Sequence, residues 1–328
     1  MHIPDGFIDA PTAVATGVAA AGVVAYSLRR TGRDMHERSV PLLGVTAAFV
    51  FAAQMLNFPV AGGTSGHLIG ALLAMVLLGP WAGVLVMTAV LVVQALVMAD
   101  GGITALGANL LNMAVAGGLL PFAVFALLRR ILARNVTGFL AAVAVSSWCA
   151  VVLASAAAAL ELAASGTVPP SVALPTMVAV HMIIGLGEAL ITTTVVAAVL
   201  ASRPDLVKTF PSNLKPPATA PALGRRGRAL TFTGAALILA LALAVFVSPF
   251  ASSSPDGLER VAEEKGFAEA ALEEPVWAGS PLPEYVFPGI ANDRVATALA
   301  GLVGTLVLFA LVFLLGRAVR GRPAPGSQ

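Results

Sequence analysis

Apolar segments separated by short polar stretches follow one another along the chain. The uncharged runs approach or exceed the roughly 20 residues that a helix needs to cross a bilayer. Segment 66–80 is the short one, and such a length is typical of a re-entrant helix or of one packed against protein. The pattern predicts an all-α polytopic membrane protein. The candidate spans cover residues 11–30, 39–57, 66–80, 81–99, 106–128, 137–164, 175–201, 229–249 and 294–316.

Positive charge lies between alternate spans. Of the 19 Lys and Arg residues, 16 fall in five places: Arg29 to Arg38, Arg129 to Arg134, Arg203 to Lys215, Arg225 to Arg228, and Arg317 to Arg322. Because cytoplasmic loops carry the excess of basic residues, all five are expected in the cytoplasm. The N-terminus is then outside and the C-terminus inside, as nine spans require. No basic segment precedes the first apolar run, which argues against a cleaved signal peptide.

Composition agrees with a membrane location and excludes other classes. The chain is 58% hydrophobic and 11% charged, with a mean hydropathy of +0.91, whereas globular domains carry about a quarter charged residues. The net charge of +2 gives no indication of nucleic-acid binding. The single cysteine, Cys149, lies in an apolar run, so no intrachain disulfide is expected.

The span map divides the chain into four parts. Residues 1–201 form a seven-span core, 202–228 a Pro-, Ala- and Arg-rich cytoplasmic linker, 229–316 a two-span unit, and 317–328 a cytoplasmic tail.

The outside loop of the two-span unit, 251–291, holds eight Asp and Glu residues against Arg260 and Lys265, a net charge of −6. Such a loop is either an anionic vestibule that concentrates cations or an ordinary soluble loop. Within it, Ser254-Pro255-Asp256-Gly257 predicts a helix start with Ser254 as the N-cap.

The N-terminus offers nitrogen ligands on the outer side. The Met1 amine, the His2 backbone nitrogen and the His2 ring nitrogen can close fused chelate rings around a small divalent cation. Ni(II), Cu(II) and Co(II) favour such nitrogen donors. His67 follows the glycine-rich stretch 62–66 on the same predicted side, and its imidazole would complete a four-nitrogen square. The predicted metal ligands are therefore Met1, His2 and His67.

Four further polar residues are candidates for contacts around an ion or along its path. His181 and Glu188 lie seven residues apart on one face of the span 175–201, and intramembrane ionisable groups often serve function. A buried Glu bonded to a neighbouring helix is the structural alternative. Ser65 lies in the glycine-rich turn, and Asn57, like Gln54 and Gln94, is also a candidate for hydrogen bonding between helices.

Three motifs carry a resemblance to a known family. Met1-His2-Ile3-Pro4-Asp5-Gly6-Phe7, then Gly63-Thr64-Ser65-Gly66-His67-Leu68, then His181 with Gly185-Leu186-Gly187-Glu188 resemble the substrate-binding membrane subunit of cobalt/nickel energy-coupling-factor (ECF) transporters (CbiM/NikM type). The likeness covers residues 1–201. Pro255-Asp256-Gly257-Leu258-Glu259 resembles the small companion subunit of the same systems (CbiN/NikN type), here fused behind the core.

The resemblance implies a transport subunit and no enzyme. It places the metal on Met1, His2 and His67, and it implies two cytoplasmic ECF-type ATPases and a coupling transmembrane subunit as partners. The chain itself has no G-x-x-x-x-G-K-[ST] phosphate loop. No permanently bound cofactor is implied, only a transported Co(II) or Ni(II) ion. A square nitrogen site favours nickel, whereas the Ile3 to Gly6 continuation resembles the cobalt branch, so the metal stays open. The membrane is that of a bacterial or archaeal cell.

Two alternatives belong to other classes. Gly63-Thr64-Ser65-Gly66 also fits rhomboid intramembrane serine proteases, with His181 as the partner histidine. That chemistry requires Ser65 Oγ within hydrogen-bond reach of the His181 ring, and it gives no role to the N-terminal motif. A stand-alone secondary carrier needs no ATPase, and only the resemblance argues against it.

Overall fold

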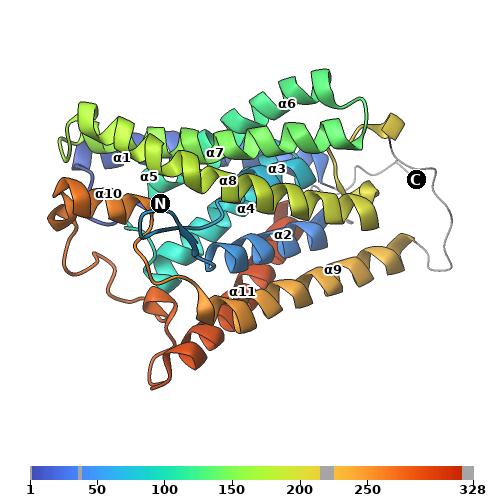
Figure 1. The fold of residues 1–328 in the computed structure, drawn as a ribbon. Coiled ribbons are helices and arrows are strands. Elements are labelled where there is room, and N and C mark those ends of the chain that lie inside the picture. The colour runs from blue at the N-terminus through green and yellow to red at the C-terminus, as the bar shows by residue number, and fades with distance from the viewer. Residues whose placement is uncertain (1, 36–38, 215–224, 320–328) are drawn as a thin grey trace.

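The computed structural model describes residues 2–35, 39–214 and 225–319. Met1, residues 215–224 of the expected linker and residues 320–328 of the expected tail lie outside these ranges. The chain forms an elongated bundle whose helices run roughly along one axis (Figure 1). Within the described part, seven helical stretches are long and apolar enough to cross a membrane, which confirms the polytopic all-α prediction: Ala10–Arg33, Pro80–Met98, Leu106–Leu132, Val136–Ala164, Pro170–Ser202, Thr231–Phe250 and Asp293–Val319.

The first 214 residues build most of the bundle. The α-helices are α1 (Ala10–Asp34), α2 (Ser39–Gln54), α3 (Ala71–Leu78), α4 (Pro80–Val93), α5 (Leu106–Leu110), α6 (Leu120–Leu132), α7 (Val136–Ala164) and α8 (Pro170–Ser202). Two π-helical segments, η1 (Gln94–Met98) and η2 (Leu111–Leu119), continue α4 and α5, and 3₁₀ turns η3 (Pro204–Leu206) and η4 (Ser212–Leu214) follow α8. A hairpin of β1 (Phe58–Val60) and β2 (Thr64–Gly66) pairs Pro59 with Ser65.

Segment 66–80, the short candidate whose length indicated a re-entrant or protein-packed helix, does not contain a spanning helix. Its helical part, α3, has eight residues, about 12 Å at 1.5 Å per residue, against a hydrocarbon core of about 30 Å. All eight are buried, and Gly70 and Gly79 at its two ends have positive φ. Irregular backbone is tolerated at this depth because protein shields it from lipid. Apolar composition alone does not distinguish a helix that spans the membrane from a short helix buried within the protein.

The second unit packs beside α2. It comprises α9 (Arg225–Ala242), the π-helix η5 (Leu243–Val247), 3₁₀ turns η6 (Ser248–Phe250), η7 (Ala268–Ala270) and η8 (Pro283–Tyr285), α10 (Gly257–Lys265) and α11 (Asp293–Val319). Both α9 and α11 contact α2, as Figure 1 shows.

The helix predicted at 254–257 exists but begins later than expected. Its N-cap is Asp256 rather than Ser254, and Asp256 forms a capping box with Glu259. The Asp256 side chain accepts from the N–H groups of Leu258 and Glu259, and the Glu259 side chain accepts from the Asp256 N–H. These reciprocal hydrogen bonds favour Asp256 as the N-cap.

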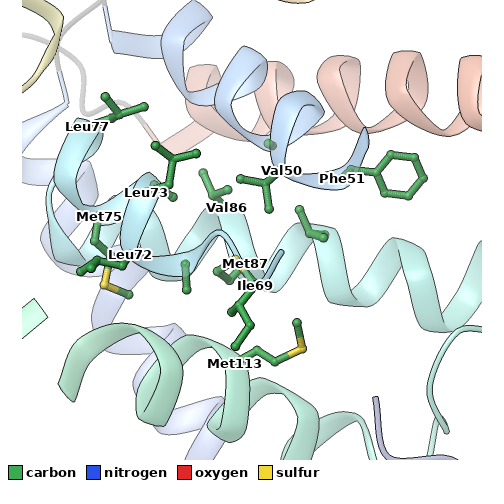
Figure 2. Packing of buried hydrophobic residues seen from close by; sticks show 14 of the residues in the cluster. Val50, Phe51, Ile69, Leu72, Leu73, Met75, Leu77, Val86, Met87 and Met113 are labelled. Atoms are coloured by element: carbon green, nitrogen blue, oxygen red, sulfur yellow. The ribbon is translucent and has the colours of Figure 1, made fainter. Parts of the chain in front are cut away.

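The core lies where α2, α3, α4 and η2 meet, and α3, which follows His67 in the chain, is buried within it. Figure 2 shows part of this cluster, in which buried apolar side chains from these elements pack together. In lipid, such packing replaces the hydrophobic effect as the source of helix association. Labelled members are Val50, Phe51, Ile69, Leu72, Leu73, Met75, Leu77, Val86, Met87 and Met113.

Candidate metal centre

The N-terminal segment is pinned by the side chain of Asn109. The Ile3 N–H donates to Asn109 Oδ1 at 2.8 Å, and Asn109 Nδ2 donates back to the Ile3 carbonyl at 3.0 Å. The Gly102 N–H donates to the same carbonyl at 2.9 Å, and the Ile3 side chain is fully buried. An amide matches a peptide unit in both donor and acceptor, so this pair fixes the backbone one residue after His2.

Asp5 ties the same segment to both units. Its Oδ1 accepts from the backbone N–H and the hydroxyl of Thr104, at 2.9 and 2.6 Å. Its Oδ2 accepts from the N–H of Val276, in the second unit, at 3.1 Å. The N-terminal motif thus fastens the segment after His2 to both units.

A tight loop after η1 brings Asp100 to His2. Ala99 and Gly101 both have positive φ, 53° and 85°, which only glycine adopts readily. A Cβ on Gly101 would lie 2.9 Å from Asn109 Nδ2 and 3.2 Å from His2 Cβ. The turn leaves Asp100 Oδ1 3.1 Å from His2 Nδ1.

The charge and hydrogen bonds of Asp100 are set by its neighbours. Tyr285 donates its O–H to the second carboxylate oxygen at 2.5 Å. Burial raises the pKa of the Asp100 carboxyl, but the His2 ring and the hydrogen bonds from His2 and Tyr285 outweigh it, and the pKa lies below its ordinary value. Burial and Asp100 raise the pKa of Tyr285 well above its usual range, so the phenol stays a donor.

His67 is presented by the β-hairpin to the same place. Its ring stacks on the His2 ring with centroids 5.4 Å apart and an angle of 12°. His67 Nδ1 lies 3.0 Å from the Leu68 carbonyl, which can only accept, so Nδ1 carries the proton and Nε2 the lone pair. Burial, reinforced by the His2 ring, lowers the pKa of His67 to about 3. A neutral imidazole is the form that binds a metal.

The His2 ring presents its nitrogens differently. Nδ1 faces the Asp100 carboxylate, whereas Nε2 is buried and has no hydrogen-bond partner among the residues that the structure describes. A chelate that includes the His2 backbone nitrogen uses Nδ1, so metal binding there would exchange the Asp100 contact for a metal–nitrogen bond. Among the described residues, no cluster of three or more His, Cys, Asp or Glu side chains is arranged as a metal cage.

Glu188 holds the backbone behind His67. Its two carboxylate oxygens accept from the N–H groups of Ile69 and Gly70, at 2.6 and 3.0 Å. Gln54 Nε2 donates to the Ile69 carbonyl at 2.7 Å. Glu188, in α8, thus holds the backbone of the loop that follows His67, and this contact corresponds to the structural alternative left open by the sequence.

His181 and Ser65 lie near the site but are not paired with each other. His181 Nδ1 bonds the Met177 carbonyl at 2.7 Å, and its ring lines a small cavity, with room for about one water molecule, together with His67, Asp256 and Gly257. The one Ser65 hydroxyl proton goes to the Ser254 carbonyl at 2.7 Å. Asn57 accepts through its backbone carbonyl from the Ser252 N–H at 2.8 Å.

Sequence reasoning missed Asp100 and Tyr285, and it gave Asp256 no place at the histidines. Asp256 Oδ2 lies 4.0 Å from His67 Nε2. An available signal was Asp100-Gly101-Gly102, an acid and two glycines directly after a span, on the side where His2 and His67 were expected. Tyr285 gave no such signal.

Comparison with known proteins identifies the two units separately. Residues 2–206 match the family described as the cobalt uptake substrate-specific transmembrane region, and residues 230–321 match the PDGLE domain. The first match covers more than half of the chain. The chain belongs to the cobalt-uptake transmembrane family. It is a member in which a PDGLE domain is fused behind the core, as the sequence motifs predicted.

Two relatives cover both units of the chain, and a third covers the first unit only. A putative fused nickel transport protein of Archaeoglobus fulgidus is 37% identical over 98% of this chain and 99% of its own length. A fused nickel transport protein of Rhodobacter capsulatus is 32% identical over 94% of this chain and 95% of its own. A cobalt transport protein of Sorangium cellulosum is 37% identical over 63% of this chain and 94% of its own.

A solved structure supports the same class. The crystal structure of a truncated transition metal transporter has a TM-score of 0.55 and 33% identity, covering 61% of this chain and 99% of that one. The chain is therefore a multi-pass membrane protein of a cobalt and nickel transport family, a transport protein rather than an enzyme.

Proposed function

We propose that this protein is the substrate-capture subunit of an ATP-driven ECF-type uptake transporter for Co(II) or Ni(II). The ion is held by the Met1 amine, by His2 and by His67. The observation that carries the proposal is the stacking of two histidines 65 residues apart in the chain, with His67 Nε2 in its lone-pair form. The Asp100 and Asp256 carboxylates beside them supply negative charge to the cation.

Transport would use partners that supply the energy. Two cytoplasmic ATPases and a coupling transmembrane subunit reorient the core, break the nitrogen site and release the ion inward. The N-terminus and the loop 251–291 face the outside, and the five basic stretches and the C-terminus face the cytoplasm. The membrane is the cell membrane of a bacterium or archaeon. The commitment of the Ser65 hydroxyl to Ser254 speaks against the protease.

Substitution of the two histidines tests the ligand set. His2→Ala and His67→Ala should each abolish tight binding of Ni(II) and Co(II) and metal uptake, because each removes one nitrogen ligand. Ser65→Ala should do much less, since its hydroxyl bonds a carbonyl rather than the ion.

Equilibrium dialysis of purified variants and uptake in cells that carry the partner subunits would measure both effects. Normal binding by both histidine variants, with loss in Ser65→Ala, would contradict the assignment and favour the serine chemistry.

A further inference from the structure

The outside loop of the second unit lies along the π-helical segment η1. Trp277 Nε1 donates to the Leu96 carbonyl at 2.8 Å, and the Ser280 hydroxyl and the Leu282 N–H both donate to the Val97 carbonyl, at 2.6 and 3.0 Å. The wide turns of a π-helix are frequent at functional sites. η1 ends at Met98, two residues before Asp100. The loop is thus fastened next to the residue that faces His2.

The last part of this loop places a phenol on Asp100. Glu284 and Tyr285 both adopt positive φ, 53° and 59°, an uncommon conformation for residues other than glycine. This strained turn directs the Tyr285 O–H to Asp100 Oδ2 at 2.5 Å, and Gln94 Nε2 donates to the phenol oxygen at 3.1 Å. Strain of this kind persists where the surroundings impose it, often at functional sites.

A continuous chain of contacts results. It runs from Gln94, which also donates to Gln54 Oε1 at 2.7 Å, through Tyr285 and Asp100 to His2. Each link joins residues that are far apart in the sequence, and Tyr285 alone comes from the second unit.

We propose that Tyr285 is a positioning residue of the metal site: its O–H holds the Asp100 carboxylate beside His2, so that a negative charge lies in a fixed place next to the bound cation. This inference rests on the proposed function. Metal binding at His2 Nδ1 replaces the Asp100 contact on that nitrogen, and the Tyr285 hydrogen bond then keeps the displaced carboxylate beside the ion. Loss of a group one shell beyond the metal ligands commonly weakens metal binding by about 10-fold to 100-fold. The second unit thereby contributes a side chain to a site whose ligands come from the first.

The alternative is that Tyr285 only packs. Its ring lies 6.1 Å from that of Phe51, and a phenylalanine would keep this contact. Tyr285→Phe therefore removes the hydroxyl alone. The chain offers a matched control, because Tyr26, its other tyrosine, lies in α1 against Trp81.

The experiment compares wild type, Tyr285→Phe, Tyr26→Phe, Asp100→Asn and the double variant Tyr285→Phe/Asp100→Asn, using Ni(II) as the probe. We expect Tyr285→Phe to weaken Ni(II) binding about 10-fold or more and to shift the visible absorption band of the bound ion, whereas Tyr26→Phe changes neither. In the Asp100→Asn background, Tyr285→Phe should add little, because groups that act through one another are not additive. An unchanged affinity and spectrum in Tyr285→Phe, or additive losses in the double variant, would overturn the proposal.

The variant His2→Ala distinguishes a failure of the proposed metal ligands from a failure of the positioning role of Tyr285. If wild type binds Ni(II) and His2→Ala does not, the proposed function stands, and the result for Tyr285→Phe decides the positioning role by itself. If His2→Ala binds Ni(II) as wild type does, the ligand assignment fails, and the positioning role fails with it.

Discussion

His2 and His67 meet an incoming ion in different states. His67 is already neutral, with Nδ1 bonded to a carbonyl and a pKa of about 3. His2 instead presents Nδ1 to a carboxylate. The protons that a metal must displace therefore come from the N-terminal side of the site and not from His67.

This difference predicts how metal affinity depends on pH. An α-amine ordinarily titrates near pH 8, and a coordinated amide must also lose its proton. Protons compete with the metal for such groups, so affinity should fall steeply from about pH 8 to about pH 5.5, with more than one proton released per ion. His67 adds nothing to this fall, because it stays neutral throughout the range. Calorimetry in buffers of different ionisation enthalpy counts the protons, and a pH-independent affinity would exclude the site.

At the scale of elements, hydrogen bonds and close packing hold two loops beside the candidate site. The 99–102 loop is held between Asn109 and the N-terminal segment, and the 67–70 loop is held by Glu188 and Gln54. Each loop contains a glycine with positive φ, Gly101 or Gly70, at which an added Cβ would come close to neighbouring side chains. Their geometry, rather than the number of ligands alone, sets where the two imidazoles meet.

Two glycines with similar backbone angles test the first loop. Gly101 and Gly62 have φ of 85° and 79°, but only at Gly101 would a Cβ contact other atoms within 4 Å. Ala at either position should cost roughly 1–2 kcal/mol of backbone strain. Gly101→Ala should in addition displace His2 and weaken Ni(II) binding by about 10-fold or more. Melting temperatures and dialysis measure the two effects; equal affinities in the two variants would show that the loop does not position His2.

At the scale of the whole molecule, the loop 251–291 of the second unit contacts the first unit at three places around the candidate site. It reaches the first unit at β2 through the Ser65 N–H and the Pro255 carbonyl (2.8 Å), at the N-terminal segment through Asp5, and at η1 through Trp277. Yet its acids Glu263, Glu264, Glu269, Glu273 and Glu274 are exposed. The loop thus has a docked face and a charged outer face.

The charged face predicts a salt-dependent capture rate. Neutralising these five glutamates with glutamine should slow uptake at low metal and low ionic strength and leave the affinity of the nitrogen site nearly unchanged. The reason is that salt screens exposed charges within about 8–10 Å at physiological concentration. Uptake rates measured at low and high salt distinguish the outcomes. Equal rates for wild type and the neutralised protein at low salt would leave the loop with its docking role only.

The helices and the two histidines could be predicted from the sequence, whereas the contacts that join the two units could not. Long apolar runs predict helices because lipid forces the backbone to bond to itself, and the N-terminal and glycine-rich motifs drew attention to His2 and His67. At 66–80 the composition is that of a span, and only the shortness of the segment indicated the buried helix that the structure contains. Asp100 and Tyr285 are 185 residues apart, and neither periodicity nor spacing could bring them together.

The proposed coordination requires the terminal amine as a metal ligand, and a Gly-Ser extension before Met1 tests this requirement most directly. The extension turns the Met1 amine into an amide and moves the new amine out of chelating range. We predict that the extended protein inserts, purifies and melts like the metal-free wild type but binds no Ni(II) or Co(II) tightly, whereas a tag after Gln328 leaves binding and uptake intact. Full metal content and uptake with the N-terminal extension would contradict the proposed coordination.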